Sequence, residues 1–191
     1  MPSRLDSITQ QRLEKLEKLR SQGIDPYPHR YHRSHTTQQA RAAFESQEAS
    51  GGQPMQVSLA GRIVGSRGMG KASFVDLRDG SGKLQVYLRR DRVGEDKYSL
   101  LRELDLGDFI GVQGTLFRTH AGEITLQATD VVLLAKSMQP LPEKWHGLTD
   151  TEIRYRQRYL DLIASDETRR VFRLRSQIVS ALRRFMDGRG F

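Results

Sequence analysis

Phe74 and Gln85 are the side chains in this sequence whose chemistry best suits the binding of an unpaired nucleobase. An exposed phenyl ring offers a flat surface for base stacking, which contributes roughly 1–3 kcal/mol per base. A primary amide both donates and accepts, so it can pair with the Watson–Crick edge of uracil. The same amide can flip and pair with cytosine, so by itself it does not specify the base.

Charged side chains narrow the choice of base. Arg67 can only donate and favours a carbonyl edge, whereas Glu123 can only accept and favours an amino or imino group. Lys71 and Arg62 are the candidates for contacts with phosphates. The competing interpretation is that Phe74 packs under a helix and that these charges form an ordinary solvated surface.

Strands must position these groups, because between residues 55 and 136 the apolar residues recur with a period of two. Residues 74–77 and 84–88 each alternate in this way, and the turn-forming stretch 79–82 joins them into a hairpin. Alternation places Phe74, Gln85, Tyr87 and Glu123 on the face opposite the core. Depending on the register, Phe74 and Gln85 are either directly opposite or diagonal.

The fold class expected is mainly β with flanking α: a five-stranded Greek-key barrel of the oligonucleotide-binding (OB) type. A helix near residues 95–106 separates the third and fourth strands, and the second and third strands present the ligand face. The predicted core consists of Val57, Leu59, Ile63, Val75, Leu77, Leu84, Val86, Leu88, Ile110, Val112, Leu116, Ile124, Leu126 and Ala128.

Helical patterns flank the barrel. We expect an N-terminal extension over residues 1–54, with helices at 5–22 and from Thr36 or Thr37 to just before Gly51. The barrel then covers 55–136, a proline-containing linker covers 137–150, and a further domain begins within 151–191. That last segment predicts two helices, over 150–163 and 166–188, with Asp166 capping the second.

The last predicted helix has one fully apolar face, which requires a partner and indicates that more protein normally follows. Its residues are Val171, Leu174, Ile178, Leu182 and Met186. Arg154, Arg156 and Arg158 lie just upstream, and they suit equally well ion pairs with another domain or contacts with RNA.

Composition restricts the function classes. The 191 residues carry a net charge of +8, which favours a polyanionic partner. The absence of cysteine excludes disulfides, thiolate zinc sites and a cysteine nucleophile. Without a signal peptide or an apolar run that could span a bilayer, we expect a cytoplasmic protein without membrane contact.

Two motifs resemble sites without meeting their requirements. Residues 65–72 approach a phosphate-binding P-loop, but Ala72 replaces the magnesium-binding hydroxyl and a strand follows instead of a helix. His29, His32 and His35 have metal-like spacing but no helix or carboxylate cluster to complete a site. We therefore expect no metal site, and no catalytic triad or carboxylate dyad is visible.

The chain resembles the bacterial-type class II lysyl-tRNA synthetases along nearly its whole length. The matching segments are 23–28, 69–74, 84–85, 134–136, 140–142 and, most specifically, 152–163. The resemblance implies that the barrel binds the anticodon of tRNA(Lys), with Phe74 stacking on the central uridine and Gln85 reading it. It also implies that Arg67 and Glu123 contact anticodon bases alongside.

In that family the full-length protein is a homodimer that ligates lysine to tRNA(Lys) through a lysyl-adenylate, using ATP and Mg²⁺. Motif 1 would begin with the helix at 166–188, and motifs 2 and 3 would lie beyond Phe191. We therefore expect this chain to need no cofactor and to be inactive alone. Two alternatives are a non-specific single-strand-binding barrel and a module that serves chiefly in assembly.

Overall fold

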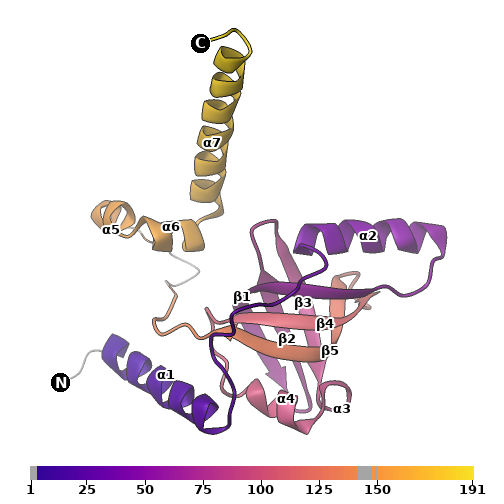
Figure 1. The fold of residues 1–191 in the computed structure, drawn as a ribbon. Coiled ribbons are helices and arrows are strands. Elements are labelled where there is room, and N and C mark those ends of the chain that lie inside the picture. Colours follow the sequence, from indigo (N-terminus) through magenta and orange to yellow (C-terminus); the bar gives the residue numbers. More distant parts are fainter. Residues whose placement is uncertain (1–3, 142–147, 149) are drawn as a thin grey trace. The chain divides into compact units, whose positions relative to one another are not determined.

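The computed structural model describes residues 4–141, 148 and 150–191 (Figure 1). Most of the segment expected to be a linker, 142–147 and 149, lies outside these residues. The chain divides into two units, Met1–Pro140 and Leu141–Phe191, and each is considered by itself. Within the described ranges, no helix is both long and apolar enough to cross a membrane.

The first unit is built around a closed five-stranded barrel with the strand order β1-β2-β3-β5-β4. The strands are β1 (Gln56–Met69), β2 (Ala72–Arg78), β3 (Lys83–Arg89), β4 (Phe109–Arg118) and β5 (Ile124–Ala135). β1 is long enough to pair with β4 through its first half and with β2 through its second. The β3–β5 pair is parallel and closes the barrel, which confirms the OB-type architecture.

β1 bends between its two partners, and small residues allow the bend. The register shifts between Ile63 and Gly65, which marks a bulge. At Gly61 a Cβ atom would lie 2.7 Å from the carbonyl oxygen of Arg78, so any side chain there would collide with backbone. This close approach keeps β1 hydrogen-bonded to both neighbours as it curves round the barrel.

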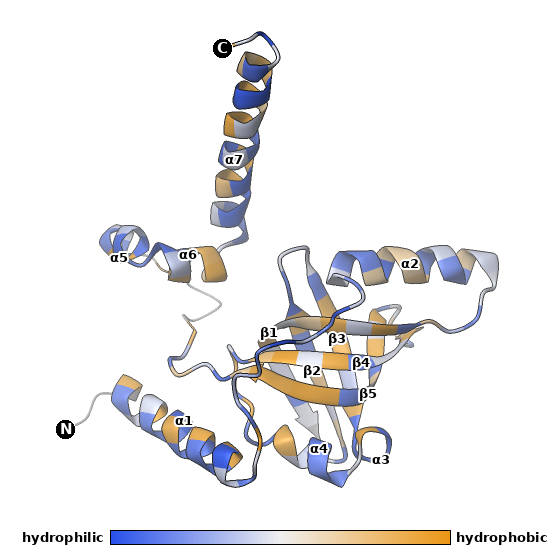
Figure 2. Cartoon of the chain, in the orientation of Figure 1, coloured by the Kyte–Doolittle hydropathy of each residue, from blue (hydrophilic) through white to orange (hydrophobic). Residues whose placement is uncertain are grey.

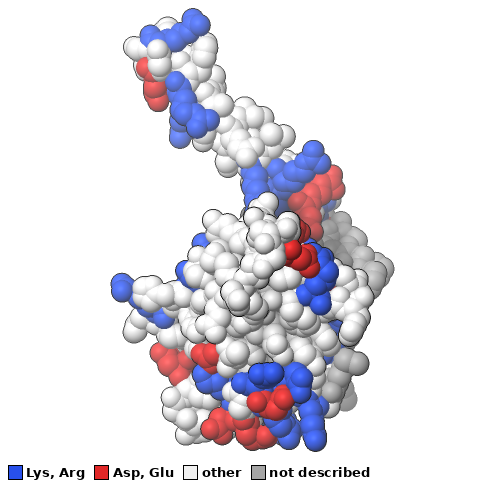
Figure 3. Space-filling view, turned by 90° about the vertical axis from the view of Figure 1, so that its right-hand side faces the viewer, with Lys and Arg blue, Asp and Glu red and all other residues white. Residues whose placement is uncertain are grey.

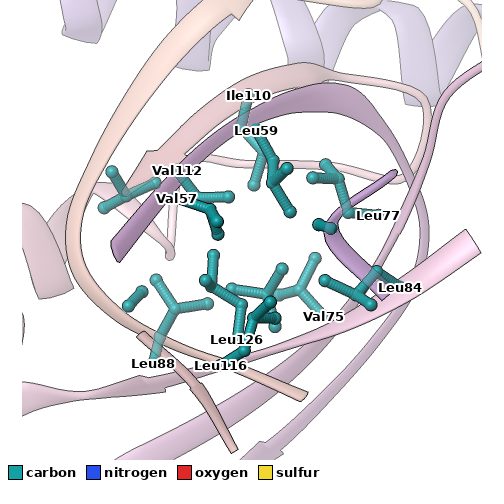
Figure 4. Packing of buried hydrophobic residues seen from close by; sticks show 14 of the residues in the cluster. Val57, Leu59, Val75, Leu77, Leu84, Leu88, Ile110, Val112, Leu116 and Leu126 are labelled. Atoms are coloured by element: carbon teal, nitrogen blue, oxygen red, sulfur yellow. The ribbon is translucent and has the colours of Figure 1, made fainter. Parts of the chain in front are cut away.

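The barrel interior contains all fourteen residues predicted for the core, and none is more than 3% exposed. Figure 4 shows side chains of this cluster converging from all five strands, with Leu59 and Ile110 facing Val75 and Leu126 across the interior. Alternation alone thus identified the inward face of every strand, because a closed barrel has a single interior.

Helices cover parts of this barrel. α1 (Arg4–Ser21) places Leu19 in a cluster with Leu100 and Leu133, and it ends before Gly23, which has a φ of 72°. α2 (Thr37–Ser50) begins with a capping box between Thr36 and Gln39, as expected from the hydroxyl there. The helix predicted at 95–106 is shorter than expected, α4 (Glu95–Leu100), and Gly94, with a φ of 85°, separates it from a preceding short helix, α3 (Arg90–Val93).

Buried ionic contacts join α1 to the end of β5. Lys136 is fully buried and donates to Asp105 at 2.5 Å and Asp108 at 2.7 Å. Lys15 of α1 also pairs with Asp105, at 2.6 Å, and Arg12 donates to the carbonyl oxygens of Ser137 and Gln139 at 2.8 Å. Although burial opposes it, hydrogen bonding from the two lysines lowers the pKa of Asp105.

The second unit contains α5 (Thr151–Arg156), α6 (Arg158–Ala164) and α7 (Asp166–Asp187). The single helix predicted over 150–163 is wrong, because Gln157 adopts φ −117° and ψ 55° and divides it. Asp166 does not cap α7; the Ser165 hydroxyl accepts from the Thr168 amide at 3.1 Å, and Asp166 is the first helical residue. A capping assignment from sequence shifts easily by one residue where two capping types are adjacent.

The apolar stripe predicted on α7 is present and exposed. Figure 2 shows hydrophobic residues recurring along this helix between hydrophilic ones. Val171, Leu174, Ile178 and Leu182 are each more than half exposed within this chain. An exposed stripe of this length is typical of a surface that another element covers.

Replacing Lys136 with methionine should lower the free energy of unfolding by about 3–5 kcal/mol, because Asp105 and Asp108 would lose their buried counter-charge. The matched control is Lys97→Met, which removes a solvent-exposed pair with Asp130 and should cost less than about 1 kcal/mol. Urea unfolding followed by circular dichroism measures both. Equal, small losses would contradict a structural role for the buried pair.

Hydrogen bonds to Asp79 connect α2 to the β2–β3 turn, and we expect this contact to be sensitive to acid. Asp79 accepts from the Thr37 amide at 2.8 Å and from the Ser81 amide at 2.8 Å. Burial raises the pKa of Asp79, but hydrogen bonds from Thr37 and Ser81 outweigh it and lower the pKa to about 2. A lowered folded-state pKa means that this stabilisation is complete above about pH 4 and is lost as the pH falls towards 2.

Asp79→Asn should therefore be less stable than wild type at pH 7, by roughly 1 kcal/mol after allowance for solvent screening. The difference between the two proteins should shrink as the pH falls below 4 and be smallest at pH 2, where about half of the wild-type carboxyl groups are protonated. Denaturant midpoints at pH 7, 4 and 2 test this, and a constant difference would refute it.

Candidate nucleic-acid interface

Strand register brings Arg67, Phe74 and Tyr87 into one row on the outer face of the barrel. The Cα partner of Arg67 on β1 is Phe74 on β2, and the partner of Phe74 on β3 is Tyr87. Val75 and Leu77 point inward on the same strand, so Phe74 points outward as the alternation predicted. The directly opposite partner of Gln85 is Asp76, which makes Phe74 and Gln85 a diagonal pair.

The aromatic rings of this face are in contact. The ring centroids of Phe74 and Tyr87 lie 4.6 Å apart with an interplanar angle of 23°, which is a stacked arrangement. Phe117 on β4 continues the series, 6.3 Å from Tyr87 and tilted. Phe74 is half-buried against Tyr87 and retains an exposed part. The ring is therefore supported from beneath, a contact that the alternation pattern allowed but did not identify.

The Gln85 amide differs from expectation in its exposure. It does not face open water, because the residue is only 5% exposed. Its Nε2 donates to Glu123 Oε2 at 3.0 Å, and its Oε1 accepts from the Thr125 hydroxyl at 3.1 Å. Thr125 is fully buried and was not recognised in the sequence, although its position between inward-facing Ile124 and Leu126 signals the outer face.

The β4–β5 turn holds Glu123 beside this amide. The Glu123 amide donates to the Thr119 hydroxyl at 3.1 Å, and the Thr119 amide donates to the Glu123 carbonyl at 3.0 Å. Gly122 makes the turn possible with a φ of 81°. Because β5 pairs with β3 through Gln85 and Thr125, the start of β5 delivers the carboxylate to the amide.

The two candidates for phosphate contacts lie apart. Lys71 is exposed in the turn between β1 and β2, near the row formed by Arg67 and Phe74. Arg62 pairs with Arg78 at the other end of β2, roughly 20 Å from Lys71 along the strand. Its guanidinium lies 4.3 Å from the Phe109 ring centroid and donates to the Gly107 carbonyl at 3.2 Å, and burial lowers its pKa. The site therefore gathers Lys71 but not Arg62.

Other sequence motifs have ordinary structural places. Residues 65–72 form the end of β1 and its turn into β2, with Gly70 at a φ of 66°. His29 and His32 are exposed, and among the described residues no three His, Asp or Glu side chains form a potential metal site. Arg154 and Arg158 both pair with Asp161, which is 1% exposed, so their charges are used within their own unit.

Charge is distributed unevenly despite the net value of +8. On the face shown in Figure 3, Lys and Arg are interspersed with Asp and Glu at the lower end of the barrel unit. Several charged side chains of the chain form ion pairs, including Arg89 with Asp91 at 2.7 Å. Arg67 and Lys71 are exposed beside the aromatic row, and neither forms an ion pair with another described residue.

Comparison with known proteins places both units in described families. Residues 57–134 match the family described as OB-fold nucleic acid binding domain. Residues 150–191 match the family described as tRNA synthetases class II (D, K and N). The first match coincides with the closed barrel, and the second covers α5 to α7.

Curated relatives extend the match across the chain. A lysine–tRNA ligase of Dehalococcoides mccartyi (strain ATCC BAA-2266 / KCTC 15142 / 195) is 52% identical over 185 residues, covering 96% of this chain and 37% of the relative. Those of Pelotomaculum thermopropionicum and Lactococcus lactis subsp. cremoris are 49% and 46% identical, covering 98% and 94% of this chain and 36% and 37% of the relatives. The chain thus spans a little over a third of their length. Over that span it is homologous to lysine–tRNA ligases, with an OB-fold nucleic acid binding domain followed by a segment that matches the class II tRNA synthetases.

Proposed function

We propose that the barrel recognises the anticodon of tRNA(Lys) through the outer face of β1, β2 and β3. The observation that carries the proposal is the diagonal pairing of an aromatic ring, Phe74, with an amide, Gln85, on adjacent strands. Phe74 stacks on the central uridine while Gln85 pairs with its Watson–Crick edge. Arg67 and Glu123 contact neighbouring anticodon bases, and Lys71 contacts phosphate.

The support from Tyr87 suits this role. A ring that is already stacked at 4.6 Å loses little conformational freedom when a base covers its other side. The stacking surface is tolerant of sequence, because every base has a π-face. Selectivity must therefore come from the amide, the arginine and the carboxylate that surround the ring.

For the whole protein we propose the activity named for its relatives, ligation of lysine to tRNA, with ATP and Mg²⁺ as cofactors and a lysyl-adenylate intermediate. It would act in the cytoplasm as a homodimer, with the α7 stripe contributing to the interface between subunits. The residues of this chain supply tRNA recognition; the adenylate chemistry belongs to motifs 2 and 3 of the family. Arginine-based anticodon contacts make the binding sensitive to salt.

Replacing Phe74 with alanine should weaken binding of an anticodon stem-loop carrying UUU by about ten-fold, because one base loses its stacking partner. It should also remove the preference of wild type for UUU over a loop with the central base changed. Fluorescence anisotropy with labelled stem-loops measures both quantities.

The matched control for that change is Phe109→Ala, which removes a partly exposed aromatic ring from outside the proposed site. It should leave the preference intact. If wild type binds both loops equally, and poly-dT competes as well as the UUU loop, the barrel is a sequence-tolerant single-strand binder instead.

A further inference from the structure

Glu123 holds a carboxylate oxygen 3.0 Å from the Gln85 amide, and the chemistry of the two groups is unequal. A carboxylate only accepts, whereas an amide has a donating end and an accepting end. If the amide were flipped, its oxygen would face the Glu123 oxygen across the same short distance, and the two would repel. The carboxylate therefore permits one orientation of the amide, with nitrogen towards Glu123 and oxygen towards Thr125.

Thr125 does not enforce this orientation. A hydroxyl can donate to the amide oxygen, as it does here at 3.1 Å, or accept from an amide nitrogen in the same place. The Glu123 carbonyl, 3.3 Å away, would take the hydroxyl proton in the second case. Of the two groups that contact the amide, only the carboxylate distinguishes its two ends.

Part of the amide remains available for a ligand. It has two N–H donors and two oxygen lone pairs, and within the described part of the chain one of each is used, by Glu123 and Thr125. The remaining donor and acceptor form the edge that a base can meet. For a base held in one position by stacking, one orientation of this edge pairs with uracil and the flipped orientation pairs with cytosine.

We propose that Glu123 is a specificity-determining positioning residue, which makes this site select uracil over cytosine by fixing the orientation of the Gln85 amide. The inference rests on the proposed function and adds a second role for Glu123, since its other carboxylate oxygen is still able to contact a neighbouring base. It also accounts for a glutamine that is nearly buried: the amide is held in place before the base arrives, so no orientation is selected at the moment of binding.

The test compares stem-loops with UUU and UCU anticodons on the full chain. Glu123→Gln keeps the shape but gives residue 123 a donor as well as an acceptor, so both orientations of the Gln85 amide become acceptable. The ratio of affinities for UUU over UCU should fall by about ten-fold, through tighter binding of the cytosine loop, as expected when a charged hydrogen bond no longer opposes the flip. Thr125→Val, which disturbs the same contacts without removing the carboxylate, should leave the ratio unchanged.

A double-mutant cycle shows whether Glu123 acts through Gln85. In a Gln85→Leu background, adding Glu123→Gln should not change the UUU-to-UCU ratio, because no amide remains to be oriented. An unchanged ratio in the single variant Glu123→Gln, or an equal loss in Thr125→Val, overturns the inference while leaving anticodon recognition standing. A wild-type chain without preference for UUU would overturn the proposed function itself.

Discussion

The candidate site depends on the parallel pairing of β3 with β5, which closes the barrel. Residues 85–87 pair with residues 125–127 in this ladder, so two segments some forty positions apart are held side by side. Without closure, β3 would be an edge strand, and the outer face of β2 and β3 would carry Phe74 and Tyr87 without Glu123. With closure, Glu123 and Thr125 meet the Gln85 amide, and the β4–β5 turn becomes part of the proposed binding face. A barrel also removes the free strand edges that would otherwise pair with other chains.

The same closure divides the face into two kinds of surface. The Phe74 ring is partly exposed and rests on Tyr87, which suits contact with any base. The Gln85 amide is nearly buried and held by hydrogen bonds, which suits discrimination between bases. Under the proposed function, affinity would come mainly from Phe74 and selectivity from Gln85, on adjacent strands. A preorganised polar group discriminates well because a mismatched ligand leaves it without a partner.

Basic residues serve two purposes in this chain, and net charge does not separate them. Lys136, Lys15 and Arg12 join α1 and the residues after β5 to each other and to the segment before β4. Arg154 and Arg158 both pair with Asp161 in the second unit. These cations are committed to structure. Arg67 and Lys71, beside the aromatic row, remain exposed and are the cations that the proposed function uses. The net charge of +8 therefore belongs to the whole chain, and only a few of its cations lie at the candidate interface.

Sequence alone determined the barrel strands, the inward residues and the outward direction of Phe74, because alternation with period two leaves one solution when a single core must be filled. It also identified the apolar stripe of α7, whose spacing is a property of any α-helix. Only the tertiary structure decided that Phe74 and Gln85 are diagonal, that Tyr87 supports the ring, and that Gln85 is covered by Glu123 and Thr125. It likewise decided that Arg62 lies away from the site and that Gln157 divides the helix predicted over 150–163. The physical reason is that period and propensity are local, whereas register, burial and pairing depend on which distant segments meet.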